Sequence, residues 1–448
     1  MTTDSAAADP ATRVKSAAST VSDVGYPHGH LGHLSEHEEA QLAAFKTLVE
    51  EKGLYKPGPP ASHDDPTLLP EDEAVFLTFP PFASYCSRYL RARRWVPEDA
   101  LTQFKDTEDW RAANDIDVLY ETIDLDAFEQ SRRLYPQWLG RRDKRGIPVY
   151  LFEVKTLDNK AISNYEKLGK DSSFSKAKFD GKTPAGMLRL FALYENLTRF
   201  TQPLSTQLQD REHRDTPITL STNIVDISGV SLKQFWNLKS HMQAASQLAT
   251  AHYPETLDRI FIIGAPVFFS TVWGWIKRWF DPITVSKIFI LSPHEVLPTL
   301  EQFIERRNIP KQYGGELEFK FGDQPTVDPA WEGLVRWENG HSSFKSRPAI
   351  WRENEDGTRV ECVGIGSVNG VEQKELICSV PKAWPSKTSA PAAEPTPAAT
   401  PVTKEGSVTE GTQTAPASEM QRLSISDTKE IAEKHTEGST ASPPTGAA

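Results

Sequence analysis

Cysteine is scarce in this chain of 448 residues. Only Cys86, Cys362 and Cys378 occur, an odd number with no CxxC spacing among them. They predict neither a disulfide framework nor a zinc site, and they indicate a reducing compartment. The first residues also lack a basic segment followed by an apolar core, so we expect no secretory signal.

An excess of positive charge and a long unbroken apolar run are missing as well. The net charge of -11 argues against a general nucleic-acid binder, because such proteins present clustered Lys and Arg over a broad face. Residues 260–276 carry no charge, but Gly264, Pro266 and Gly274 interrupt them. We therefore do not expect this segment to cross a membrane, which takes about 20 predominantly apolar residues in a helix.

The two ends of the chain differ in composition from its middle. Residues 1–35 are rich in Ala, Ser, Thr and Gly, and residues 384–448 are rich in Pro, Ala, Thr and Ser, so we expect disorder in both. Four histidines mark the first boundary: His28, His30, His33 and His37. We interpret them as a solvated polar stretch, because no Cys or carboxylate partner completes a metal site.

After residue 35, the sequence first shows apolar residues at helical spacing. It predicts an amphipathic helix over residues 36–51, two short helices within residues 81–114, and a later helix from residue 188 to about residue 203. Residues 157–182 are polar and rich in Ser and Lys, which predicts a loop or an insertion.

Strands and helices then alternate. A strand at residues 147–152 is followed by strands at 218–227, 259–263 and 287–291, with helices at 231–250, 268–280 and 293–307. This order predicts an α/β fold with a largely parallel sheet. Residues 330–382 instead show short alternating stretches around an Asn-Gly pair, which predicts a small β appendage with a hairpin.

The aromatic segment at residues 264–282 is the most informative feature. Its predicted helix is apolar on nearly every side, through Phe268, Phe269, Trp273, Trp275, Ile276, Trp279 and Phe280. Such a helix is either buried in a core or in contact with lipid. Tryptophan favours membrane interfaces, and Lys277 and Arg278 can meet anionic headgroups, so we expect a lipid-facing wall. A lipid carrier needs such a cover, because each acyl CH₂ exposed to water costs about 0.8 kcal/mol.

Polar side chains near the strands suggest a place for a headgroup. Thr219, Ser221 and Asn223 share one face of the predicted strand 218–227, and their partners are either a headgroup in a cavity or solvent at a sheet edge. Glu255 and Lys287 each precede a strand. A carboxylate can accept from sugar-like hydroxyls and an ammonium can neutralise a phosphate, although an ordinary surface ion pair is the commoner arrangement.

Seven motifs occur in a fixed order: Tyr135-Pro136-Gln137, Gly146-Ile147-Pro148-Val149-Tyr150, Ile224-Val225-Asp226-Ile227-Ser228-Gly229, Tyr253-Pro254-Glu255, Gly264-Ala265-Pro266, residues 281–289 and Tyr313-Gly314-Gly315. In this order the chain resembles the CRAL-TRIO family, and within it the Sec-fourteen-like phosphatidylinositol transfer proteins of fungal type. The resemblance covers about residues 75–320.

The resemblance implies a lipid-binding fold whose mostly parallel sheet forms the floor of a cavity. It implies a helical N-terminal part at residues 36–125 and a lipid-binding domain at residues 126–320, gated by the helix at residues 268–280. It also implies that the chain is not an enzyme and needs no cofactor beyond a bound phospholipid.

The resemblance also assigns residues to the headgroup. By motif position Glu255, Thr284 and Lys287 match residues that hold the inositol phosphate, with Arg91 or Arg93 as a further contact. Ser221 and Tyr150 match positions that serve a choline headgroup, but Asn223 stands where a second hydroxyl is expected. The expected ligand is therefore phosphatidylinositol, with phosphatidylcholine as a less supported second lipid.

We expect a monomeric, cytoplasmic phosphatidylinositol transfer protein that contacts membranes transiently and binds no nucleic acid. A sensor or scaffold that holds a lipid, sterol or haem without transferring it is the alternative. An α/β hydrolase would suit the order of strands and helices, but Ser367 lacks the G-x-S-x-G context of such enzymes.

Overall fold

The computed structural model describes residues 25–54, 82–171, 174–208, 210–279 and 282–381. All of these residues belong to the first of two compact units, Met1–Pro385. The second unit, Ser386–Ala448, lies outside the described residues, as does the disorder expected at residues 1–24 and 384–448.

Among the described residues, the N-terminal part contains the helices α2 (Glu36–Glu51), α3 (Phe82–Ala92), α4 (Pro97–Ala113), α5 (Ile116–Thr122) and α6 (Leu125–Leu134). The first begins at a capping box, in which Ser35 and Glu38 satisfy each other's backbone amides. Phe45, Tyr89, Leu90 and Phe104 bring α2, α3 and α4 together in one apolar cluster.

The central sheet has the order β1-β2-β3-β4-β5. Its strands are β1 (Gln137–Arg142), β2 (Pro148–Glu153), β3 (Ser221–Asp226), β4 (Leu257–Ile263) and β5 (Ile288–Leu291). The first strand is antiparallel to its neighbour, and β2 to β5 are parallel. The mostly parallel sheet is therefore as the sequence predicted.

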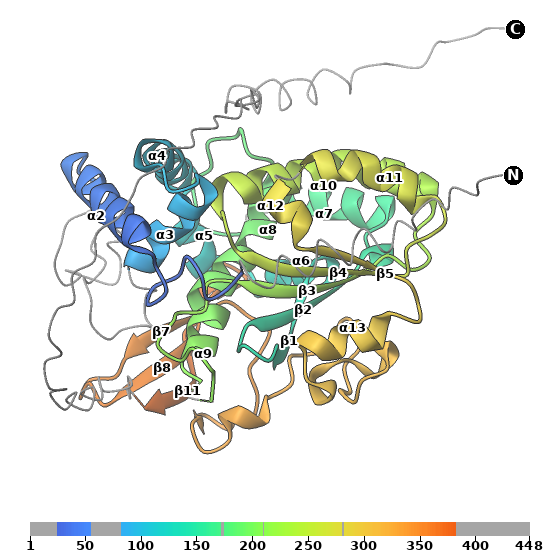
Figure 1. Ribbon diagram of the computed structural model, residues 1–448. Coiled ribbons are helices and arrows are strands. Elements are labelled where there is room, and N and C mark those ends of the chain that lie inside the picture. Colours follow the sequence, from blue (N-terminus) through green and yellow to red (C-terminus); the bar gives the residue numbers. More distant parts are fainter. Residues whose placement is uncertain (1–24, 55–81, 172–173, 209, 280–281, 382–448) are drawn as a thin grey trace, which may run out of the picture. The chain divides into compact units, whose positions relative to one another are not determined.

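Helices cover both faces of this sheet. They are α7 (Asn159–Asp171), α8 (Ala185–Asn196) with a π-helical continuation (Leu197–Thr201), α9 (Gln202–Thr206), α10 (Leu232–His252), α11 (Phe269–Ile276), α12 (Pro282–Ser286) and α13 (Val296–Phe303). Figure 1 shows α7, α8, α10 and α11 on one face and α13 on the other. Short 3-10 turns occupy Val154–Thr156, Lys277–Trp279, Arg306–Asn308, Lys311–Tyr313 and Pro329–Trp331.

Alternation along the strands separates two apolar layers. Ile260 and Ile262 of β4 face the layer that α8, α10 and α11 share, whereas Phe261 and Ile263 face the layer that contains α13. The face under α8, α10 and α11 is called the inner face below, because it carries the candidate site.

The expected β appendage is a second sheet with the order β6-β11-β8-β7. Its strands are β6 (Arg336–Trp337), β7 (Ala349–Glu353), β8 (Arg359–Gly364) and β11 (Glu375–Pro381), and β9 (Ser367–Val368) pairs with β10 (Val371–Glu372) as the expected hairpin. This sheet packs on the rest of the unit: Trp351 stacks on Phe200 at 5.8 Å, and the Tyr120 hydroxyl donates to the Ala349 carbonyl at 2.8 Å.

Three expectations from the sequence differ from the structure. Residues 157–182 contain α7, because Ile162 and Tyr165 repeat at helical spacing and are buried against α8. The expected helix at 268–280 is shorter, since α11 ends at Ile276 and a 3-10 turn follows. Residues 25–35 are not disordered, because Tyr26 is buried and donates to the Thr216 carbonyl at 3.2 Å.

Candidate functional site

The inner face of the sheet is covered by helices but incompletely filled. Val225, Ile260 and Ile290, on three neighbouring strands, are only half-buried. In a sheet covered on both faces such side chains are normally fully buried. The helix opposite shows the same property, because only Leu238 and His241 of the 21 residues of α10 are buried. Apolar side chains of the sheet and of α10 thus face each other without full contact.

The short helix α11 lies at one side of this space. Phe269 and Val272 are buried, and Phe268, Trp273 and Ile276 are half-buried against the inner face. Val267 and Trp275 point outward, with 99% and 39% of their surface exposed. Of the residues predicted to form the gate, Phe280 lies outside the described residues, as does the side chain of Trp279.

A glycine sets the start of this segment. Gly264 follows β4 with a φ of +70°, and a Cβ atom there would lie 1.9 Å from the Ser228 hydroxyl. Only glycine fits so close an approach in this backbone conformation. The turn that leads from the sheet to α11 is therefore fixed by packing.

The predicted pair of Glu255 and Lys287 meets at the other end of the strands. The Lys287 ammonium donates to Glu255 Oε2 at 3.2 Å and to the Leu257 carbonyl at 3.2 Å. Both side chains keep 16% of their surface exposed. Thr284 lies on α12 directly before them, and its carbonyl accepts from the Lys287 amide at 3.1 Å. These three residues therefore form one polar cluster at the N-terminal ends of β4 and β5.

The backbone of Glu255 is strained. Its φ of +53° lies in the left-handed region, which costs a residue with a side chain about 1–3 kcal/mol. Such strain tends to gather at ligand-binding sites. The turn that carries Glu255 is held by Arg88 of α3, whose Nε donates to the Pro254 carbonyl at 3.1 Å.

The two arginines assigned to the headgroup lie in different surroundings. Arg91 is on α3, and burial lowers its pKa to about 10 despite the nearby charge of Glu255. Arg93 is exposed beyond the end of α3, and its Nε donates to Gln103 Oε1 at 2.8 Å. Arg91 is thus the arginine that faces the Glu255 cluster.

Ser221, Asn223 and Tyr150 gather on the inner face, near the N-terminal end of β3. Asn223 Nδ2 donates to the Ser221 hydroxyl at 3.1 Å, and Tyr150 is the register partner of Asn223 on β2. The Tyr150 hydroxyl donates to Thr201 Oγ1 at 3.2 Å, and burial raises the pKa of this tyrosine. The polar row is therefore enclosed and does not lie at a solvent-facing edge of the sheet.

One buried residue of this region, His30, was not predicted from the sequence. It is 5% exposed and lies next to Gly29, whose carbonyl accepts from Arg91 Nη1 at 3.0 Å. Its histidine-rich surroundings suggested a solvated stretch. The closely spaced Gly29 and Gly32 could have indicated an ordered turn in this segment. Both have positive φ values, +71° and +84°, and they allow the chain to fold back here.

The described residues contain neither a candidate metal site nor a candidate membrane span. No group of three or more His, Cys, Asp and Glu side chains there could hold a metal ion. Likewise, none of the helices in the described part of the chain has the length and apolar character needed to span a membrane.

Comparison with known proteins places the chain in a family. The CRAL/TRIO domain matches residues 132–315. A SEC14 cytosolic factor of Eremothecium gossypii is 28% identical over 293 residues, which cover 65% of this chain and 80% of that protein. A CRAL-TRIO domain-containing protein of Saccharomyces cerevisiae is 30% identical over 295 residues, with 64% and 80% covered. A phosphatidylinositol/phosphatidylcholine transfer protein of Arabidopsis thaliana is 29% identical over 229 residues, with 51% and 38% covered. The chain therefore belongs to the CRAL/TRIO family, as a Sec14-like member of the fungal type.

Proposed function

We propose that this chain binds phosphatidylinositol in a closed apolar cavity and transfers it between membranes, without catalysing a reaction. The observation that carries the proposal is the incompletely filled inner face, which has the Glu255–Lys287 pair at one end and α11 at the other. Relatives with phosphatidylinositol and phosphatidylcholine transfer in their names support the same assignment.

The cavity is placed between β3, β4, β5 and α10. Each acyl CH₂ removed from water is worth about 0.8 kcal/mol, so lipid chains stabilise half-buried apolar walls that would otherwise contact water. Val225, Ile260 and Ile290 on the sheet and Met242 and Leu248 on α10 are the proposed walls.

The headgroup is assigned to the Glu255 cluster. The Lys287 ammonium neutralises the phosphodiester, and Glu255 accepts hydrogen bonds from the inositol hydroxyls once the ligand competes for its ion pair. Thr284, on the helix beside them, is assigned to the same headgroup. Ser221 and Asn223 already bond to each other, which disfavours a choline headgroup there.

Membrane contact is assigned to the outer side of α11 and the start of α10. Val267 and Trp275 are exposed, and so are Leu232 and Trp236, with 44% and 46% of their surface. The rings of Trp236 and Trp275 lie 5.2 Å apart, and the Lys239 ammonium lies 5.3 Å from the Trp236 ring centre. Tryptophan beside lysine suits an anionic membrane interface, so we propose a cytoplasmic protein that contacts membranes peripherally and transiently.

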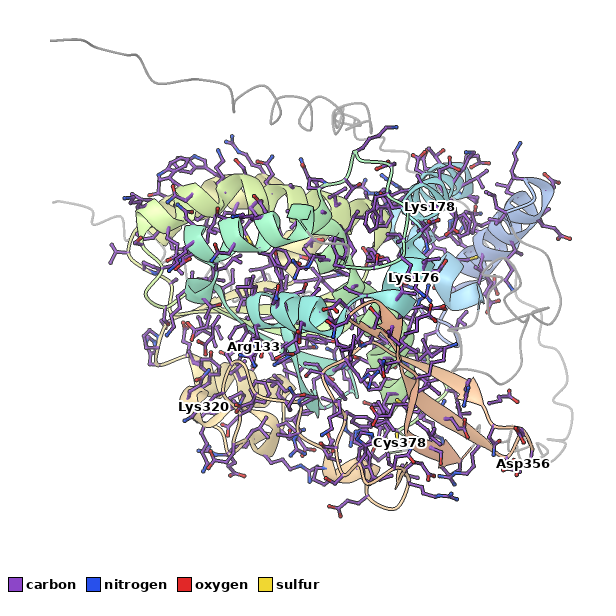
Figure 2. The ribbon with its side chains drawn as sticks, turned by 180° about the vertical axis from the view of Figure 1, so that it is seen from behind. Arg133, Lys176, Lys178, Lys320, Asp356 and Cys378 are labelled. Atoms are coloured by element: carbon purple, nitrogen blue, oxygen red, sulfur yellow. The ribbon has the colours of Figure 1, made fainter. Side chains whose placement is uncertain are left out.

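Transfer between vesicles tests the proposal. Lys287→Ala should reduce phosphatidylinositol transfer to background, because the half-buried Glu255 carboxylate is left without its cation and would face the phosphate. Lys320→Ala is the matched control, since Lys320 is exposed on the segment after α13 (Figure 2) and should transfer like the wild type. Unchanged transfer by Lys287→Ala would refute the headgroup assignment.

Mass spectrometry of ligand extracted from the purified chain distinguishes a transfer protein from a sensor or scaffold that holds its ligand without transferring it. Recovered phosphatidylinositol that exchanges with vesicles supports a transfer protein. A sterol or haem that stays bound during incubation with vesicles would instead identify a sensor or scaffold.

A further inference from the structure

The segment at residues 25–33 is joined to the Glu255 cluster through α3. Arg91 donates through Nη1 to the Gly29 carbonyl at 3.0 Å, and Arg88 donates to the Pro254 carbonyl beside Glu255. A Cβ atom on Gly29 would lie 3.3 Å from Arg91 Cδ, so glycine allows this close contact. This segment lies outside residues 132–315, which match the family.

His30 presents an unused hydrogen-bond acceptor in this segment. Its Nδ1 lies 3.0 Å from the His28 carbonyl, and because a carbonyl can only accept, Nδ1 carries the hydrogen. Burial, together with the charges of Arg91 and Lys287, holds the pKa of His30 well below its usual range, so the ring is neutral. Its Nε2 therefore carries a lone pair, and it has no hydrogen-bond partner among the described residues.

Arg91, which bonds the Gly29 carbonyl next to His30, presents unused donors. Nη1 is satisfied by the Gly29 carbonyl and the Ser87 hydroxyl, the latter also at 3.0 Å. Nε and Nη2 are buried and donate to no acceptor within the described part of the chain. Buried polar atoms are almost always paired with protein, water or a ligand, so these unpaired atoms on His30 and on Arg91, which bonds the neighbouring Gly29, indicate a further polar group in this region.

A hydroxyl group complements this arrangement. It can donate its hydrogen to Nε2 while its oxygen accepts from a guanidinium nitrogen. A phosphate dianion or a carboxylate has no hydrogen for Nε2, and a quaternary ammonium has none either and would be repelled by Arg91 and Lys287. The chemistry therefore favours a ligand that carries a hydroxyl group, as inositol does.

We propose that His30 is a specificity-determining residue that, with Arg91, binds a ring hydroxyl of the inositol headgroup. The inference rests on the function proposed above and extends it, because it places residues 25–33 at the headgroup. A site built to bond a hydroxyl rejects a ligand that lacks one, so His30 favours phosphatidylinositol over phosphatidylcholine.

Substitution of His30 in the full chain tests this role. His30→Phe keeps a flat ring but removes the acceptor, whereas His30→Gln offers an amide oxygen in its place. His37→Phe is the matched control, because His37 is exposed on α2. Transfer is measured from phosphatidylcholine vesicles that contain a minor fraction of phosphatidylinositol, with each lipid labelled in turn.

We expect His30→Phe to lower phosphatidylinositol transfer about tenfold, the usual scale for one buried hydrogen bond, and to leave phosphatidylcholine transfer unchanged. His30→Gln should recover much of the loss, and His37→Phe should behave like the wild type. Soluble myo-inositol in excess should not inhibit the wild type if the site takes a lipid headgroup. Inhibition that His30→Phe abolishes would instead assign the site to a free polyol.

Wild-type transfer by His30→Phe would overturn the inference and leave the proposed function intact. Equal loss of both lipids with a lowered melting temperature would give His30 a structural role and also overturn it. A wild-type chain that transfers phosphatidylcholine but no phosphatidylinositol would refute the proposed ligand, and the inference with it.

Discussion

Replacing Ile260 with tryptophan tests whether the inner face borders a space large enough for a ligand. Ile260 is half-buried, whereas Ile262, on the same face of the same strand, is 8% exposed. An indole at position 260 would cover roughly 40 Å² more apolar surface, and at ~25 cal/mol per Å² it should stabilise the ligand-free chain by about 1 kcal/mol. At position 262 the same indole enters packed side chains and should cost about 1–3 kcal/mol.

Urea unfolding of the delipidated chain measures the change in the free energy of unfolding, which should be positive for Ile260→Trp and negative for Ile262→Trp. Removing lipid first is necessary, because a bound ligand stabilises the folded state and would obscure the difference. Ile260→Trp should also retain less lipid after purification, since the indole occupies the same space. If Ile260→Trp destabilises the chain as much as Ile262→Trp does, the space is already filled and the cavity argument fails.

Two further predictions concern the exposed rings of Trp236 and Trp275 and the buried ring of His252. The double variant Trp236→Ser, Trp275→Ser should weaken sedimentation with anionic vesicles about a hundredfold, because each large apolar side chain contributes about 1.5 kcal/mol when it is buried in the membrane. Val118→Ser, whose wild-type side chain is also 39% exposed but lies on α5, should bind like the wild type. Burial and the charge of Arg111 lower the pKa of His252 to about 3, so below its ordinary value of 6.5 the unfolded chain takes up the proton first. Stability should therefore fall between pH 7.5 and pH 5.5 by roughly 1 kcal/mol from this residue. His252→Gln should remove that part of the pH dependence in urea titrations, and a curve as steep as the wild type's would contradict the assignment.

Local patterns predicted most of the elements. The helix at residues 36–51 agrees with α2, because Ser35 and Glu38 form its cap and Gly53 follows its end with a φ of +66°. The parallel strands were also predicted, since their apolar runs lie between helical segments of ordinary length. Glu255 and Lys287 could be paired in advance, because the N-terminal ends of adjacent parallel strands lie side by side.

The remaining errors concern contacts between residues far apart in the chain. Residues 25–35 are polar, and their order depends on distant partners: Arg91 bonds Gly29 across 62 positions, and Tyr26 bonds Thr216 across 190. The composition of residues 25–35 does not indicate a partner so far away in the sequence. The helix α7 was not predicted because most of its side chains are polar. Among its described side chains only Ile162 and Tyr165 are buried, and two apolar residues do not make a clear helical pattern.

A change of polarity along β3 decides how a lipid would lie in the proposed cavity. Ser221 and Asn223 come first on the inner face, and Val225 and Ile227 follow on the same face. The polar end is the end at which Glu255 and Lys287 meet, whereas the apolar end leads toward Gly264 and α11. At ~3.3 Å per residue, the seven residues of β4 separate the two ends by roughly 20 Å. A headgroup at the polar end therefore places the acyl chains under α11, so opening of that helix would release the apolar part of the lipid first while the headgroup stays bound.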